Sequence, residues 1–217
     1  MSTIQEDSTA ISDLIWLLED DDRQAATLEQ DLVENYSRLT RDKIIRIPTE
    51  AEFLAKLKEV FETKTAKRPR LVIADVMLPW AFLGKEPEGL VRPIEVNTTH
   101  GFRSAGARCW DALRSRERAA QARKTPFVFH TVLRADEFEY PRRYSDENTG
   151  YIPKDQPFDA LRLEIKKVTD LNEEWNEADW SESEEEVSQH LLADPEMKRT
   201  LFEGLHIPLS ECVPYPA

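Results

Sequence analysis

The chain has 217 residues, a net charge of −13, a hydrophobic fraction of 40% and a charged fraction of 33%, which is typical of a soluble globular protein. No apolar run reaches the ~18 residues that a transmembrane helix needs, and the first ten residues lack the basic start and apolar core of a signal peptide. The negative charge argues against non-specific binding to nucleic acid or anionic membranes. Cys109 and Cys212 have no metal-binding spacing, so we expect a reduced, cytoplasmic protein.

Strands and helices are predicted in alternation along the first 171 residues, from apolar runs and from helical spacing of apolar residues. The strands are expected over residues 14–19, 43–48, 70–75, 125–131 and 150–154. The helices are expected over residues 23–39, 49–62, 101–120 and 157–171, with a further one between the last two strands, where Pro141 interrupts the pattern. This alternation predicts a parallel sheet with helices on both faces.

Acidic residues are concentrated after residue 171. Residues 172–217 hold 12 of the 42 Asp and Glu residues but only 2 of the 29 Lys and Arg residues. The sequence therefore predicts a domain over residues 13–171 and an acidic, partly helical extension over residues 172–217. The extension either packs on its own domain, or it acts as a docking segment for a partner or as a shield released on phosphorylation. It is too short and too acidic for the usual DNA-binding output domain.

Polar residues stand at the predicted strand ends, where open parallel sheets place their sites. The first strand ends at Glu19, Asp20 and Asp21, and the third ends at Asp75. The fourth and the fifth end at Thr131 and Lys154. Clustered carboxylates repel one another and need a cation, and oxygen ligands favour Mg²⁺ over zinc. With such an ion, a carboxylate can attack phosphorus, while a hydroxyl and an ammonium group hold the phosphoryl oxygens.

These segments resemble the receiver domain of two-component response regulators. "LLEDD" (17–21), "DVMLP" (75–79), "FHT" (129–131) and "GYIPK" (150–154) occur in the order of that family within residues 13–171. The resemblance implies a flavodoxin-like, doubly wound α/β fold with strand order 2-1-3-4-5.

The resemblance also implies a Mg²⁺ site beside a phosphoacceptor. Asp75 would accept the phosphoryl group. Glu19, Asp20, Asp75 and the backbone carbonyl of Met77 would hold the ion, directly or through water.

Three further residues receive roles from the resemblance. Thr131 would contact the phosphoryl oxygen and move inward on phosphorylation. Lys154 would pair with Asp75 and then with the phosphate. Tyr151 would swing from an exposed to a buried position.

The implied function is a response regulator that takes its phosphoryl group from a histidine kinase or phosphorelay protein and signals through protein contact. It would catalyse its own phosphotransfer and dephosphorylation rather than act as a turnover enzyme. The alternative is a pseudo-receiver, an interaction module that phosphorylation does not regulate. A phosphohydrolase of similar layout is disfavoured because Met77 stands where its second catalytic aspartate would be.

The chain departs from the family pattern in three places. An insertion of about residues 80–100 starts beside Asp75 and is either a lid over the site or a tolerated surface loop. Val132 is larger than the usual residue after the hydroxyl and should narrow access to the phosphoryl group. Asp155 replaces the usual proline after Lys154. Elsewhere, Asp22 is expected to cap the first helix, and His130 is expected to face the other side of the sheet from Thr131 as a packed or solvent-facing residue.

Overall fold

The computed structural model describes residues 13–36, 39–82, 90, 92, 94–97, 101–138 and 140–170. Much of the predicted insertion at 80–100 and the whole acidic extension at 172–217 lie outside the described residues. The two alternatives for each of them therefore stay predictions.

A five-stranded parallel sheet forms the centre of the domain. Its strands are β1 (Ile15–Leu18), β2 (Ile44–Arg46), β3 (Leu71–Ala74), β4 (Phe127–Thr131) and β5 (Thr149–Pro153). The order is β2-β1-β3-β4-β5, so the predicted flavodoxin-like fold is confirmed. In the register, Leu18 lies opposite Ala74, and Thr131 lies opposite Pro153. The carboxyl ends of β1, β3, β4 and β5 therefore meet at one edge of the sheet.

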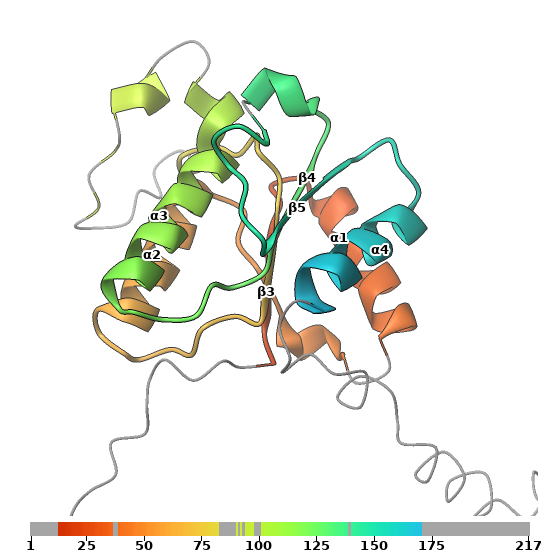
Figure 1. The fold of residues 1–217 in the computed structure, drawn as a ribbon, viewed down its shortest axis with the longest axis horizontal. Coiled ribbons are helices and arrows are strands. Elements are labelled where there is room, and N and C mark those ends of the chain that lie inside the picture. The colour runs from red at the N-terminus through yellow and green to blue at the C-terminus, as the bar shows by residue number, and fades with distance from the viewer. Residues whose placement is uncertain are drawn as a thin grey trace, which may run out of the picture.

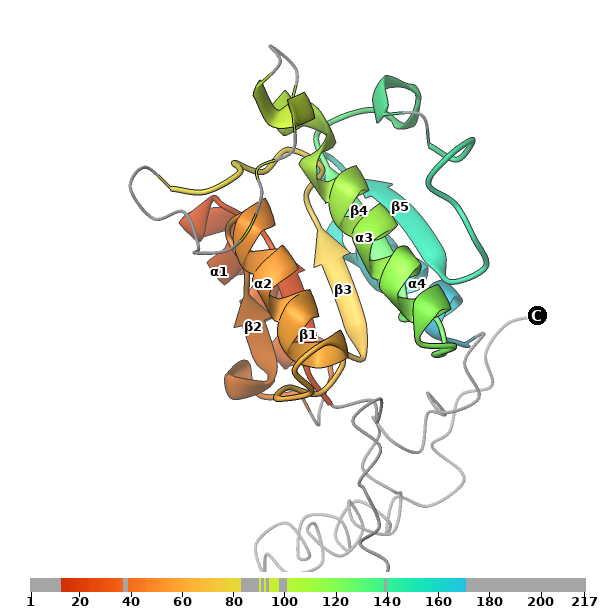
Figure 2. The same ribbon diagram turned by 90° about the vertical axis from the view of Figure 1, so that its left-hand side faces the viewer.

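Helices cover both faces of this sheet. They are α1 (Asp22–Asn35), α2 (Glu50–Phe61), α3 (Ala105–Ala119) and α4 (Phe158–Asp170). Figures 1 and 2 show α2 and α3 together on one face, and α1 and α4 on the other. Four short 3-10 helices complete the described elements: η1 (Arg41–Lys43), η2 (Ile94–Asn97), η3 (Gly101–Ser104) and η4 (Ala135–Phe138). Within the described ranges, no helix combines the length and the apolar content that a bilayer crossing requires.

The strands are continuous apolar runs because the helices bury both faces of the sheet. Along β1, Ile15 belongs to the core under α1 and α4, and Trp16 belongs to the core under α2 and α3. The same alternation places Val128 on the first side and Phe129 on the second. All residues of β1, β3 and β4 are buried.

Side chains at the helix starts satisfy backbone amides there. Asp21 caps α1, because its carboxylate accepts hydrogen bonds from the amides of Arg23 (2.8 Å) and Gln24 (3.1 Å). The prediction that Asp22 is this cap is wrong by one residue, since Asp22 is already helical. Thr49 caps α2 by accepting a hydrogen bond from the amide of Glu52.

The predicted helix between β4 and β5 is wrong. Of residues 132–138 and 140–148, which the structure describes, only Ala135–Phe138 is helical, as the single 3-10 turn η4. Turns follow it up to β5. Pro141 explains this, because proline lacks the amide hydrogen that a helix needs and disfavours helical backbone at the preceding residue.

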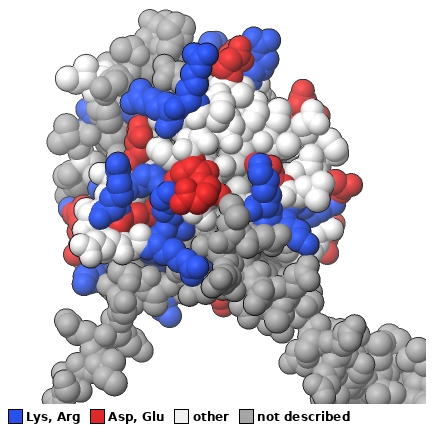
Figure 3. All heavy atoms as spheres, viewed as in Figure 1, with Lys and Arg blue, Asp and Glu red and all other residues white. Residues whose placement is uncertain are grey.

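Charges of both signs are interspersed on the face that looks toward the viewer in Figure 1. Figure 3 shows Lys and Arg side chains spread over this face with Asp and Glu side chains between them. Among the described residues of this face, the positive charges therefore form no broad uninterrupted patch of the kind that nucleic-acid phosphates attract.

Candidate functional site

Four strand ends bring the predicted polar side chains to one place. Glu19 follows β1, Asp75 follows β3, Thr131 ends β4 and Lys154 follows β5. Asp75 is only 5% exposed, and its backbone amide donates to the carbonyl of Leu18. The site is therefore built into the edge of the sheet rather than displayed on a surface loop.

The carboxylate of Asp75 accepts three hydrogen bonds. The hydroxyl of Thr131 donates to Oδ1 at 2.7 Å, and the backbone amide of Met77 donates to the same oxygen at 3.0 Å. The ammonium group of Lys154 donates to Oδ2 at 2.6 Å. These donors fix the orientation of the carboxylate and stabilise its negative charge.

Lys154 joins two carboxylates. Its Nζ lies 2.6 Å from Asp75 Oδ2 and 2.6 Å from Glu19 Oε2, and the three side chains are almost fully buried. Burial alone would lower the pKa of Lys154, but the ion pairs with Asp75 and Glu19 outweigh it and raise the pKa. Lys154 therefore remains an ammonium ion at neutral pH.

Glu19, Asp20 and Asp75 form an acidic cluster. One carboxylate oxygen from each lies within 4.8 Å of the other two. Burial raises the pKa of Glu19, and Lys154 offsets only part of this rise. Partial desolvation raises the pKa of Asp20, and the charge of Asp75 adds to it. When ionised, the carboxylates outnumber the one ammonium group by two charges, which fits a hard divalent cation.

The roles assigned to all of these site residues stay predictions, including those of the Met77 carbonyl and of the switch residues. The amide of Met77 contacts Asp75, whereas the role of the Met77 carbonyl is untested. The Thr131 hydroxyl already lies against Asp75 and also accepts a hydrogen bond from the amide of Leu133 at 3.4 Å. Tyr151 is half-buried and donates its hydroxyl to the carbonyl of Leu133 at 2.8 Å. The predicted movements of Thr131 and Tyr151 would start from these positions.

Gly106 is a residue of the site that the sequence interpretation missed. A Cβ atom there would lie 2.2 Å from the carbonyl oxygen of Asp75, and the Gly106 amide donates to the carbonyl of Val76. Only glycine lets α3 approach the acceptor segment this closely. The sequence did offer a signal, because a glycine inside a predicted helix often marks a close approach of two backbones. The predicted helix at 101–120 contains two glycines, however, and Gly101 instead begins the separate 3-10 turn η3.

A partly buried ion pair supports the segment after Asp75. Arg108 on α3 makes two hydrogen bonds to Glu50 at the start of α2, at 2.7 and 2.6 Å. The first amides of α2 donate to the carbonyls of Pro79 and Trp80. These contacts hold the segment between the two helices and thereby position the backbone next to Asp75.

His130 lies on the α1 and α4 side of the sheet. It is 8% exposed, and its side chain has no hydrogen-bond or ion-pair partner among the described residues. Burial lowers its pKa to about 4, and the charge of Lys154 adds to this effect. The imidazole is therefore neutral at physiological pH.

We expect His130→Leu to remove an acid-sensitive part of the stability. As the pH falls from 6.5 to about 4, the unfolded histidine binds a proton that the folded one does not. The parent therefore loses up to about 3 kcal/mol of unfolding free energy over this range. Urea unfolding of both proteins at neutral pH and near pH 4 measures the difference. Equal acid losses in the two proteins would contradict the assignment.

Comparisons with known proteins found similar folds among solved structures only. No protein-family model and no curated protein matches the chain. The phosphorylated cyanobacterial phytochrome response regulator RcpA is 17% identical, with a TM-score of 0.43, over 73% of this chain and 92% of that chain. A signal receiver domain of a histidine kinase from Syntrophus aciditrophicus is 18% identical, with a TM-score of 0.46, over 75% and 93%. The Mn²⁺-bound response regulator Rcp1 is 18% identical, with a TM-score of 0.43, over 77% and 96%.

Proposed function

We propose that residues 13–171 form a response-regulator receiver domain whose Asp75 accepts a phosphoryl group in a Mg²⁺-dependent reaction. The observation that carries this proposal is the pair of hydrogen bonds from Thr131 and Lys154 to the two oxygens of one buried carboxylate. The acidic cluster of Glu19, Asp20 and Asp75 beside it supports the proposal, because it offers the oxygen ligands that Mg²⁺ prefers.

Asp75 is the nucleophile in this proposal. One of its oxygens forms a bond to phosphorus as the bond from phosphorus to the donor nitrogen breaks, and the donor keeps the electron pair of the broken bond. The carboxylate thereby becomes an acyl phosphate with more negative charge than before. Lys154 and Thr131 lie where that added charge develops, and their donors can turn from the carboxylate to the phosphoryl oxygens.

Glu19, Asp20, Asp75 and the Met77 carbonyl would hold the Mg²⁺ ion. When bound, the ion supplies positive charge that shields the phosphoryl oxygens from the carboxylates around them. Lys154 supplies the remaining positive charge and keeps Glu19 and Asp75 oriented, since it bonds both.

The proposed donor is a histidine kinase or a phosphotransfer protein in the cytoplasm, and the proposed output is contact with a partner protein. The acidic composition of residues 172–217 favours a protein partner over DNA, whose phosphates attract positive charge.

Incubation of the full chain with Mg²⁺ and acetyl phosphate tests the proposal. We expect the intact mass to rise by one phosphoryl group, and we expect EDTA to prevent this gain because it removes the ion. A chain that gains no mass with Mg²⁺ present would instead be a pseudo-receiver. Continuous release of inorganic phosphate from a phosphomonoester would point to a hydrolase.

Val132 is expected to slow the loss of the phosphoryl group. It follows Thr131 directly, and its side chain is 58% exposed at the rim of the site, where it can obstruct an approaching water molecule. We expect Val132→Ala to release phosphate several-fold faster than the parent, as measured by a phosphate-release time course after removal of the donor. Identical rates would show that Val132 does not control access.

A further inference from the structure

A pocket of about 560 Å³ lies beside the acidic site, on the side of the sheet that α1 and α4 cover. Its walls come from the start of α1, the end of β4 and the turn between β5 and α4. Glu19 and Lys154 form its edge toward Asp75, where they make an ion pair with each other. The volume falls within the range of about 300–1,000 Å³ that is usual for small-molecule sites.

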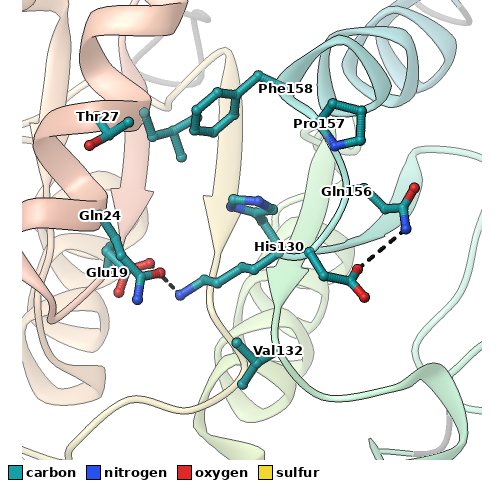
Figure 4. Close-up of a pocket in the computed structure, with 11 residues that line it drawn as sticks. Glu19, Gln24, Thr27, His130, Val132, Gln156, Pro157 and Phe158 are labelled. Carbon is teal, nitrogen blue, oxygen red and sulfur yellow. Dashed lines mark hydrogen bonds and ion pairs between the residues drawn. The ribbon is translucent and has the colours of Figure 1, made fainter.

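The imidazole of His130 is a buried polar group inside this pocket. Figure 4 shows its ring between the α1 residues and the turn that leads into α4. His130 is more than nine-tenths buried, yet no described residue hydrogen-bonds to its nitrogens. Its ring nitrogens are not among the fully buried polar atoms that lack a partner, so they border the open space of the pocket and can pair with a ligand there. In its neutral form the imidazole offers one donor and one acceptor.

The remaining lining residues define the chemistry of that ligand. Leu28, Val132 and Phe158 provide apolar walls, and the Phe158 ring centre lies 6.5 Å from that of His130. Lys154 is neutralised by its two carboxylate partners, and Asp155 adds a further negative charge at the wall. A flat aromatic body fits the apolar walls, whereas an anion would meet net negative charge.

We propose that this pocket binds a small heteroaromatic molecule, neutral or cationic, that hydrogen-bonds to His130 and packs against Phe158. This ligand site borders the phosphoryl site proposed above and shares Glu19 and Lys154 with it, but it takes a different ligand. Its existence does not depend on whether Asp75 is phosphorylated.

Benzimidazole is a suitable probe, because it is flat and carries one ring N–H and one acceptor nitrogen. The chain has four histidines, and His130→Leu identifies the His130 signal in a carbon–proton NMR spectrum of histidine-labelled protein. We expect benzimidazole to shift the His130 signal saturably and to leave the other three nearly unchanged. Benzoate, an anion of similar size, should bind at least about tenfold more weakly, because it meets net negative charge at the pocket wall.

Three variants make the test decisive. His130→Leu keeps the volume but removes the hydrogen-bonding nitrogens, so benzimidazole binding measured by saturation transfer should weaken about tenfold. Thr27→Trp, at an exposed lining position of α1, should fill the pocket and abolish binding. Leu163→Ala, at an exposed position of α4 outside the pocket, should leave binding unchanged. Absence of a saturable shift at the solubility limit, or equal affinity in the parent and His130→Leu, would overturn the proposal.

Discussion

Asp75→Asn is expected to abolish phosphorylation of the chain by acetyl phosphate and by a donor protein. An amide oxygen is a far weaker nucleophile than a carboxylate, and it also brings no charge to the Mg²⁺ site. The fold should survive, because Lys154 keeps its ion pair with Glu19 and the surrounding strands keep their apolar cores. Intact mass spectrometry measures the phosphoryl group, and circular dichroism checks the fold.

Asp136→Asn provides the matched control for this experiment. Asp136 is an exposed aspartate shortly after β4, and it pairs only with the exposed Arg134 among the described residues. The control should gain a phosphoryl group as readily as the parent. If Asp75→Asn gained one equally well, the acceptor would be another residue and the role proposed for Asp75 would be wrong.

Arg114→Ala is expected to destabilise the domain by about 3–5 kcal/mol, because it leaves buried charges without their partner. Arg114 is 4% exposed and donates to Asp146 at 2.8 Å, to Glu117 at 2.8 Å and to the carbonyl of Thr125 at 2.9 Å. It thereby connects α3 to the segments that precede β4 and β5. Urea unfolding monitored by circular dichroism measures the loss.

The control for this loss lies two residues further along the same helix. Arg116 pairs with the exposed Glu62 at 3.4 Å, so Arg116→Ala should cost less than about 1 kcal/mol. Similar losses in the two variants would mean that the buried network around Arg114 is not what joins α3 to β5.

The sheet could be predicted from the sequence because its strands are buried on both faces. Such strands are short continuous apolar runs, and the acidic or polar residue that ends each run marks the carboxyl edge of the sheet. Asp75 and Lys154 could be placed at one edge for this reason, although 79 positions separate them. The resemblance to receivers then assigned each of them a role.

Features that depend on contacts between distant segments could not be predicted in the same way. To predict that Lys154 pairs with both Asp75 and Glu19, one would need to know the lengths and directions of three side chains in the folded domain. Gly106 was missed because its role lies in the approach of α3 to Asp75, which no local pattern encodes. The pocket at His130 was missed because its walls come from three separate segments.

A crystal structure of the chain with Mg²⁺ and beryllofluoride, a phosphoryl mimic, tests the account most directly. We predict that the mimic bonds to Asp75, that Thr131 Oγ1 and Lys154 Nζ contact its fluorine atoms, and that the ion lies on the acidic cluster. A mimic bound elsewhere, or Thr131 and Lys154 turned away from Asp75, would contradict the account.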